Sequence, residues 1–155
     1  MDETQNPYAA PKSDIARAPE KSGPEVKKVF SPGQGSVGTF LGGPLAGVYF
    51  IRANFLAKGD SKRALLATIW GIVVCAGILL ALPFLPEKMP GFIVPLAYTI
   101  TARLIIERAQ FTKAQIVDSD TLTFHSNWRV AAVAALGLLI FGVVGVGIFF
   151  LVSPI

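Results

Sequence analysis

The sequence predicts an all-α protein, an integral membrane helical bundle with about four hydrophobic segments and a disordered N-terminal tail. The first observation is composition: 52% of the 155 residues are hydrophobic, only 15% are charged, and the mean hydropathy is +0.56. Soluble domains carry about 25% charged residues. The second is clustering, because residues 64–82 and 130–152 contain no charged side chain, and about 20 apolar residues cross a hydrocarbon core.

The tail covers residues 1–35. It is rich in proline and charge and poor in large apolar residues, so it cannot bury enough surface to offset the entropy of ordering. Its stretch "NPYAAP" places Tyr8 between Pro7 and Pro11. If the tail binds a partner, Tyr8 is the candidate docking anchor, because proline-rich segments bind in extended form.

The first hydrophobic segment, about 36–56, has two interpretations. Taken as one helix over about 36–56, which includes the run "SVGTFLGGPLAGVYFI", the segment is long enough to cross a membrane; this is the preferred interpretation and makes four spans. Gly42, Gly43 and Pro44 interrupt the run, and proline and glycine break helices. The alternative is therefore a re-entrant hairpin that turns at these residues.

The remaining segments follow in order at about 63–83, 91–108 and 129–152. Asp60 and Ser61 are N-cap candidates for the second segment, and "PFLPEKMPG" predicts a non-helical loop after it. The third segment is shorter and has Pro95 near its start, where proline is tolerated. The fourth is the most apolar, with Trp128 at its predicted membrane boundary.

The basic residues predict the orientation. The net charge is +4, and the connectors after the first and third segments carry most of the Lys and Arg close to the apolar runs, which places both connectors on the cytoplasmic side. The connector after the second segment has only Lys88. Four spans would put the tail outside, against Lys27 and Lys28, whereas a re-entrant first segment would keep it inside. The side of the tail is left open here.

Small residues spaced four apart predict close helix packing. The candidates are Gly38, Gly42, Gly43, Gly47 and Gly71. Small-xxx-small ridges let helix backbones approach where lipid supplies no hydrophobic drive. Packing within one chain and a seam between copies are both consistent with this pattern.

Four polar residues near segment ends are candidates for a ligand or lipid-headgroup contact: Arg52, Asn54, Arg103 and Glu107. Ionisable groups close to a membrane span are functional suspects. Arg103 and Glu107 stand four residues apart, so a boundary ion pair on one helix face is the alternative.

No catalytic residue, cofactor site or metal site is predicted. Cys75 lies inside an apolar run and His125 is the only histidine, so neither a thiolate metal site nor a disulfide is expected. "GQGSVG" at 33–38 matches a dinucleotide fingerprint, but a membrane segment follows it in place of a βαβ unit. Nucleic acid is not an expected partner, since the basic residues flank apolar runs instead of forming a stripe.

Three stretches carry a resemblance to known proteins: "NPYAAP" (6–11), "FLGGPLAGVYFIRANF" (40–55) and "SNWRV" (126–130). On them the chain resembles small bacterial multi-pass inner-membrane proteins of unknown function. The resemblance implies a location in the bacterial plasma membrane and covers about a third of the chain.

The expected role is structural or regulatory, without enzymatic activity, through a membrane protein partner or a second copy in the lipid bilayer. The alternative is a small oligomeric transporter or channel. A transporter needs a polar stripe along a cavity, for which the sequence offers only Thr68, Tyr98, Thr99, Thr101 and Arg103.

Overall fold

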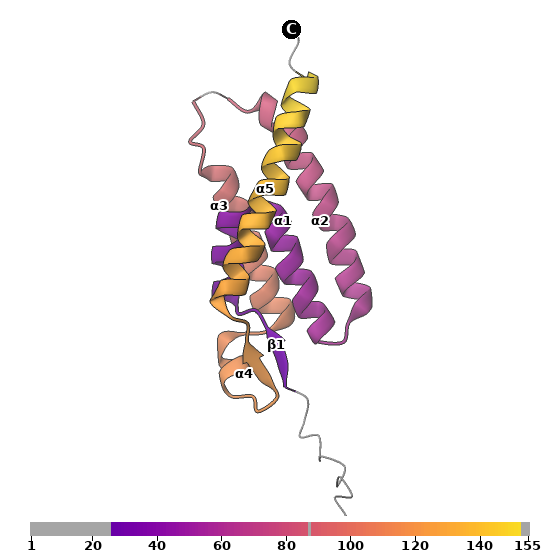
Figure 1. The fold of residues 1–155 in the computed structure, drawn as a ribbon, viewed down its shortest axis with the longest axis vertical. Coiled ribbons are helices and arrows are strands. Elements are labelled where there is room, and N and C mark those ends of the chain that lie inside the picture. Colours follow the sequence, from indigo (N-terminus) through magenta and orange to yellow (C-terminus); the bar gives the residue numbers. More distant parts are fainter. Residues whose placement is uncertain (1–25, 87, 153–155) are drawn as a thin grey trace, which may run out of the picture.

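The computed structural model describes residues 26–86 and 88–152, and Figure 1 shows their fold. Helices dominate, and two short strands pair beside them. The elements in chain order are β1 (Lys27–Val29), α1 (Pro32–Ala57), α2 (Ser61–Ala81), the short 3₁₀ helix η1 (Leu82–Phe84), α3 (Ile93–Ile105), the π-helical turn η2 (Ile106–Gln110), α4 (Lys113–Val117), β2 (Leu122–Phe124) and α5 (Asn127–Val152).

Helix α1 is two helical arms that fold back on each other. Gly43 has φ 73° and ψ −177°, a backbone conformation that essentially only glycine adopts. Pro44 follows it and has no N–H to continue the first arm. Across the turn, Gly47 lies against Thr39 and Gly38 lies against Phe50, so the arms run antiparallel.

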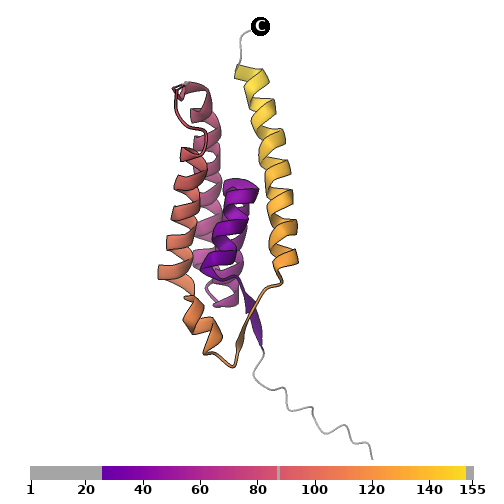
Figure 2. The same cartoon turned by 90° about the vertical axis from the view of Figure 1, so that its left-hand side faces the viewer.

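The fold-back corrects the preferred interpretation of the first segment. Both ends of α1 lie at the end of the bundle where β1 lies, and α1 extends only part of the way along α2 and α5 (Figures 1 and 2). The structure therefore has the hairpin that the alternative interpretation predicted for the first segment, and how this segment meets a membrane stays a prediction. The reason is the backbone at Gly43, together with the contacts that hold the two arms side by side.

The hairpin formed by α1 is the core around which the other helices pack. Helices α2, α3 and α5 each pack extensively against α1, whereas α2 and α5 touch each other only slightly. Half of the most apolar window of α1 is buried, compared with 11% in α2 and in α5. The central cluster includes Phe30, Phe50, Phe55, Ile106 and Val130. Most of the large apolar side chains of α2 and α5 are consequently exposed.

Three of the described helices are long and apolar enough to cross a membrane, judged by length and composition: Pro32–Ala57, Ser61–Phe84 and Asn127–Ile148. The first of these is the folded-back α1. The predicted segments 63–83 and 129–152 correspond to α2 and α5, and 91–108 corresponds to α3 with η2.

Local signals account for the helix starts. Ser31 caps α1, and its side chain and that of Gln34 exchange hydrogen bonds with each other's backbone N–H groups, the arrangement of a capping box. Asp60 caps α2 by accepting from the N–H of Arg63 at 2.9 Å. The prediction of Asp60 as an N-cap is confirmed.

Strands β1 and β2 form a small parallel pair, with Lys27 opposite Leu122 and Val29 opposite Phe124. The prediction of an all-α fold is incomplete in this respect. The predicted boundary of the tail at residue 35 is also wrong, because Val29 and Phe30 are fully buried and α1 begins at Pro32. The reason is pairing with a strand about 95 residues further along the chain, which no local pattern reveals.

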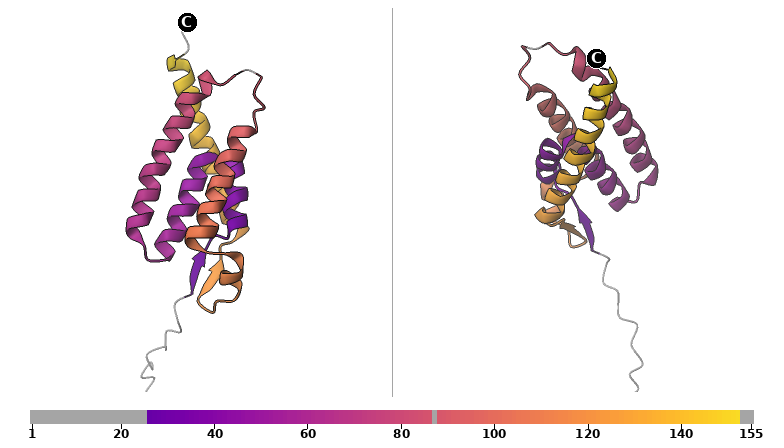
Figure 3. Two further views of the ribbon diagram at one scale, coloured as in Figure 1. Left: turned by 180° about the vertical axis from the view of Figure 1, so that it is seen from behind. Right: turned by 45° about the horizontal axis from the view of Figure 1, so that its top comes forward.

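The pairing also places the basic segments together. The α1–α2 connector, the stretch from η2 to β2, and β1 all lie at one end of the bundle, and the loop after η1 lies at the other, with the last residues of α5 (Figure 3). Eight basic residues belong to these segments or to the adjoining first turns of α2 and α5: Lys27, Lys28, Lys58, Lys62, Arg63, Arg108, Lys113 and Arg129. Lys88 belongs to the loop at the second end.

Candidate functional site

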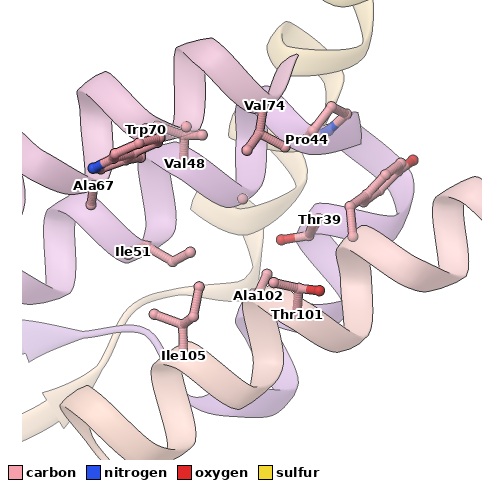
Figure 4. Close-up of a pocket in the computed structure, with 13 residues that line it drawn as sticks. Thr39, Pro44, Val48, Ile51, Ala67, Trp70, Val74, Thr101, Ala102 and Ile105 are labelled. Carbon is pink, nitrogen blue, oxygen red and sulfur yellow. The ribbon is translucent and has the colours of Figure 1, made fainter. Parts of the chain in front are cut away.

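A groove of about 230 Å³ lies between α1, α2 and α3 (Figure 4). Both arms of α1 contribute to it, through Thr39 on one side of the turn and Val48 and Ile51 on the other. Trp70 and Val74 of α2 form a second wall. The third wall comes from α3 and includes Tyr98, Thr101, Ala102 and Ile105.

Small residues shape this groove. Gly71 of α2 packs directly against Val48 of α1, where a Cβ atom would not fit. Gly47 faces Thr39 so closely that a Cβ atom would lie 2.9 Å from Thr39 Cγ2. Ala67 and Ala102 leave open space on the α2 and α3 walls because their side chains are short. The glycines thus allow α2 and the two arms of α1 to pack closely beside the groove.

Thr39 supplies the buried polar atom of the groove. The residue is 1% exposed, and its Oγ1 has no hydrogen-bond partner within the described part of the chain. Figure 4 shows this oxygen pointing into the space bordered by Ile51, Val74 and Ala102. A Cβ atom added at Gly47 would lie 3.0 Å from Thr39 Oγ1, so this hydroxyl is enclosed where the two arms of α1 pack together.

The polar residues predicted for a transport stripe do not form one. Thr68 donates to Ala64 O and Thr101 donates to Ala97 O, each at 2.8 Å. Only Tyr98 and Thr101 of the five line the groove. Thr99 Oγ1 is buried elsewhere without a partner among the described residues. The groove is accordingly apolar apart from a few separate hydroxyls.

A second hollow of about 220 Å³ lies between α2, α3 and α5. Ile78 and Leu82 border it from the end of α2, and Phe141 borders it from α5. Tyr98 borders both this hollow and the groove. The two spaces therefore adjoin at Tyr98.

Asn54, a predicted candidate for a ligand or headgroup contact, instead bonds to the backbone of its own chain. It is 0% exposed. Its Oδ1 accepts from the N–H of Phe30 and its Nδ2 donates to the C=O of Phe30, both at 2.8 Å. The amide thereby links Phe30, the residue that follows β1, to the second arm of α1. The prediction is corrected because the backbone of Phe30 engages both ends of the amide.

The other predicted polar contacts lie outside the groove. Arg52 is exposed on the second arm of α1. Arg103 Nε lies 3.6 Å from Glu107 Oε2, and the two side chains are 59% and 47% exposed. Exposed pairs of this kind contribute little to stability. The structure brings Arg103 and Glu107 together and leaves Arg52 apart from them, and a headgroup contact for any of the three stays a prediction.

The predicted packing glycines lie at turns and contacts. Gly38 faces Phe50 and Val130, and a Cβ atom at Gly42 would meet the backbone of Ala134 in α5 at 2.5 Å. Sequence reasoning missed Gly137, where a Cβ atom would lie 2.7 Å from Gly42 O. Gly42 and Gly137 thus lie where α1 and α5 pack closely together. The run 130–152 is rich in glycine and contains Gly137, and this richness could have indicated a close helix contact there.

His125 joins the strand pair to the helices outside the apolar region. Its ring stacks on Phe30 at 4.1 Å between centroids, and its C=O accepts from Gln34 Nε2 at 2.7 Å. Burial lowers the pKa of His125, and the positive charges of Arg129 and Lys28 lower it further. The "SPGQ" capping-box pattern at 31–34 could have indicated Gln34, whereas its contact with His125 is long-range.

Within the described residues, no three His, Cys, Asp or Glu side chains lie close enough together to hold a metal ion. Tyr8, the predicted docking anchor, lies outside the described residues. No protein-family model, curated protein or solved structure matches the chain.

Proposed function

We propose that this chain is a non-enzymatic multi-pass protein of a bacterial inner membrane, with a structural or regulatory role exercised through protein contacts in the bilayer. Helices α2, α3 with η2, and α5 would cross the membrane, and α1 would enter it as a re-entrant hairpin. The resemblance of "NPYAAP", "FLGGPLAGVYFIRANF" and "SNWRV" to small bacterial inner-membrane proteins supports the location.

The distribution of charge supports one orientation. The basic segments and β1 share one end of the bundle, and Lys and Arg are in excess on the cytoplasmic side of membrane proteins. In this proposal the tail, the α1–α2 connector and the stretch from η2 to β2 face the cytoplasm. The loop after η1 faces the opposite side.

The observation that carries the proposed role is the outward face of α2 and α5. A Cβ atom added at Gly77, Gly142 or Gly147 would meet nothing within 4 Å. Their neighbours Val143 and Val146 are 68% and 57% exposed. Exposed glycines on a helix allow another helix to pack closely against it in lipid. Within the chain, α1 and α5 already pack closely at Gly42 and Gly137.

Cross-linking in native membranes tests this role. A photo-cross-linking amino acid at position 142 or 147 of the full chain should give a discrete adduct, either with another membrane protein or at twice the 16.5 kDa mass of this chain. The matched control is position 134, since Ala134 is only 4% exposed and faces α1. Only lipid adducts from both outward positions would contradict the proposal.

The alternative, a small oligomeric transporter or channel, has less support. The hydroxyls of Thr68 and Thr101 bond to their own helices, and the groove walls are mainly apolar. A conducting path would then have to form between copies. Ion or solute flux from proteoliposomes that is lost on disrupting the cross-linked contact would favour this alternative.

A further inference from the structure

The groove between α1, α2 and α3 is open along the side where α2 and α3 stand apart. Both helices pack extensively on α1 but not on each other, and α1 lies behind the space between them (Figure 3, left). Trp70 lines the groove from α2 and is 65% exposed. In a membrane this open side would face lipid. Because the lining is mainly apolar, a hydrocarbon chain is the group that fits it best.

Two walls of the groove continue into basic residues at the end of the bundle where β1 lies. Arg63 precedes Ala67 of the α2 wall by four residues, so the two share one face of the helix. Lys58, the C-cap of α1, follows Ile51 of the α1 wall by seven residues, which is two helical turns. Both basic side chains are exposed. The groove therefore leads toward positive charge.

The third wall ends in the same way. Arg108 is exposed in η2, three residues after Ile105 of the α3 wall. Lys58 Nζ donates to Ala109 O at 3.1 Å, which holds the ammonium group between the end of α1 and η2. An ammonium group has three donors, and this bond uses one. The neighbouring Glu107 is paired with another arginine of α3.

Positive charge at this end of the groove is only partly neutralised. A shallow hollow in the α1–α2 connector is lined by polar side chains, among them Lys58, Asp60, Lys62 and Arg63. Asp60 Oδ2 lies 3.2 Å from Arg63 Nε. Within residues 26–86 and 88–152, no carboxylate forms a salt bridge with Lys58 or Arg108. A ligand with a negatively charged group would complement these cations.

We propose that the groove binds one anionic phospholipid from the leaflet at the basic end of the bundle. One acyl chain lies along the groove, for which a volume of about 230 Å³ accommodates part of a chain. The phosphate group lies between Lys58, Arg63 and Arg108. Basic pockets between membrane helices bind anionic headgroups, and each nearby Lys or Arg strengthens the attraction. A zwitterionic lipid has the same chains without net charge and binds more weakly.

This inference goes beyond the proposed role in protein contacts. It needs a bilayer, but it does not depend on the exposed glycines of α2 and α5. Gly71 packs on α1 beside the groove, whereas Gly77 has no neighbour within 4 Å. Cross-linking at α5 and lipid binding in the groove can thus succeed or fail separately.

Brominated lipids provide the test, because bromine atoms on an acyl chain quench tryptophan only at close range. The full chain carrying Trp128→Phe leaves Trp70, in the groove, as its tryptophan. It would be reconstituted in phosphatidylcholine vesicles with increasing fractions of chain-brominated phosphatidylglycerol. We expect quenching that saturates at a low fraction. Chain-brominated phosphatidylcholine should quench only in proportion to its fraction, and equal quenching by the two lipids would overturn the proposal.

Substitutions at the basic end test the headgroup contact. Arg63→Gln and Arg108→Gln should each raise the half-saturating fraction of phosphatidylglycerol by about fivefold, the effect of one basic residue near an anionic surface. Lys113→Gln is the matched control, because Lys113 is exposed in α4 at the same end and does not line the groove. It should leave that fraction unchanged. Equal effects of Lys113→Gln and Arg108→Gln would mean diffuse attraction to the whole surface and would overturn the site.

Two further measurements test the acyl chain. Ala67→Leu fills part of the groove without changing charge, so it should also raise the half-saturating fraction; unchanged binding would place the chain elsewhere and contradict the proposal. Inorganic phosphate, added to the Trp128→Phe protein at constant ionic strength, should not displace the brominated phosphatidylglycerol, because phosphate has no chain. Complete displacement by phosphate would identify a site for a free anion instead of a lipid.

Discussion

At the residue scale, one asparagine side chain joins distant parts of the fold. Asn54 satisfies both backbone groups of Phe30, which lies 24 residues earlier. Phe30 in turn packs edge-to-face with Phe50, and its ring lies over that of His125. A buried backbone N–H or C=O without a partner is costly, so the short segment between β1 and α1 depends on this amide for its path.

Asn54→Ala should destabilise the protein. It leaves the N–H and C=O of Phe30 buried and unpaired, and each such group costs about 1–3 kcal/mol. Unfolding of the purified chain in mixed micelles, followed by circular dichroism, measures the change. Arg52→Ala is the matched control, because Arg52 is exposed on the same arm. Equal stability of the two variants would contradict the role of the amide.

His125 should make stability depend on pH. Its pKa in the folded chain is lowered, chiefly by burial and also by Arg129 and Lys28, so the unfolded chain binds the proton more readily. Stability should then be highest above the ordinary histidine pKa of about 6.5 and fall as the pH drops through the lower folded pKa. His125→Phe keeps a ring against Phe30 and should reduce this dependence, measured as Tm from pH 8 to 5. A pH profile identical to that of the native chain would contradict the assignment.

At the element scale, the length of each α1 arm limits how far the α1 hairpin could reach into a membrane. Residues 32–42 and 44–57 form arms about 16 and 21 Å long at 1.5 Å per residue. A hydrocarbon core is about 30 Å thick, so neither arm crosses it alone. Irregular backbone at membrane depth is tolerated where protein covers it, and α2, α3 and α5 surround the hairpin.

Gly43→Ala should destabilise the hairpin. Any Cβ atom at φ 73° and ψ −177° is strained, at a cost of about 1–3 kcal/mol. A steric clash does not contribute to this cost, since the nearest Phe141 atom would lie 3.7 Å from that Cβ. Gly33→Ala is the control, because Gly33 has an ordinary helical backbone and a single neighbouring atom at 3.9 Å. The same unfolding titration compares them, and an unchanged Gly43→Ala protein would argue against the turn.

At the scale of the whole molecule, the strand pair decides which segments share an end. Lys27 N–H donates to Thr121 O and His125 N–H donates to Val29 O, beyond the ladder between β1 and β2. The start of the described chain is thereby tied to the stretch between η2 and α5. In a membrane, this tie requires that both face the same compartment.

Cysteine labelling of intact cells checks this arrangement. In a Cys75→Ala background, Val26→Cys and Ser119→Cys should be labelled by a membrane-impermeant maleimide only after permeabilisation. Lys88→Cys should be labelled without it. Val26 is 55% exposed and Ser119 lies in an exposed turn, so access is set by the membrane. Labelling of both Val26→Cys and Lys88→Cys in intact cells, before permeabilisation, would mean that α1 crosses the membrane.

The candidate site was only partly predictable. Tyr98 and Thr101 stood out as hydroxyls in an apolar run, and both line the groove. Thr39 did not stand out, because its importance depends on the second α1 arm folding back over it. Arg52 and Arg103 carry the charge that sequence patterns reveal, but their exposure keeps them away from the groove.

The sequence by itself determined the helices 63–83 and 129–152, the cap at Asp60 and the segregation of basic residues, because hydrophobic run length, capping and charge are local properties. Only the tertiary structure decided that α1 folds back, that Val29 pairs with Phe124, and that Asn54 holds Phe30. The physical reason is that glycine and proline permit either a kinked crossing or a hairpin. Contacts between residues distant in the chain select one of the two.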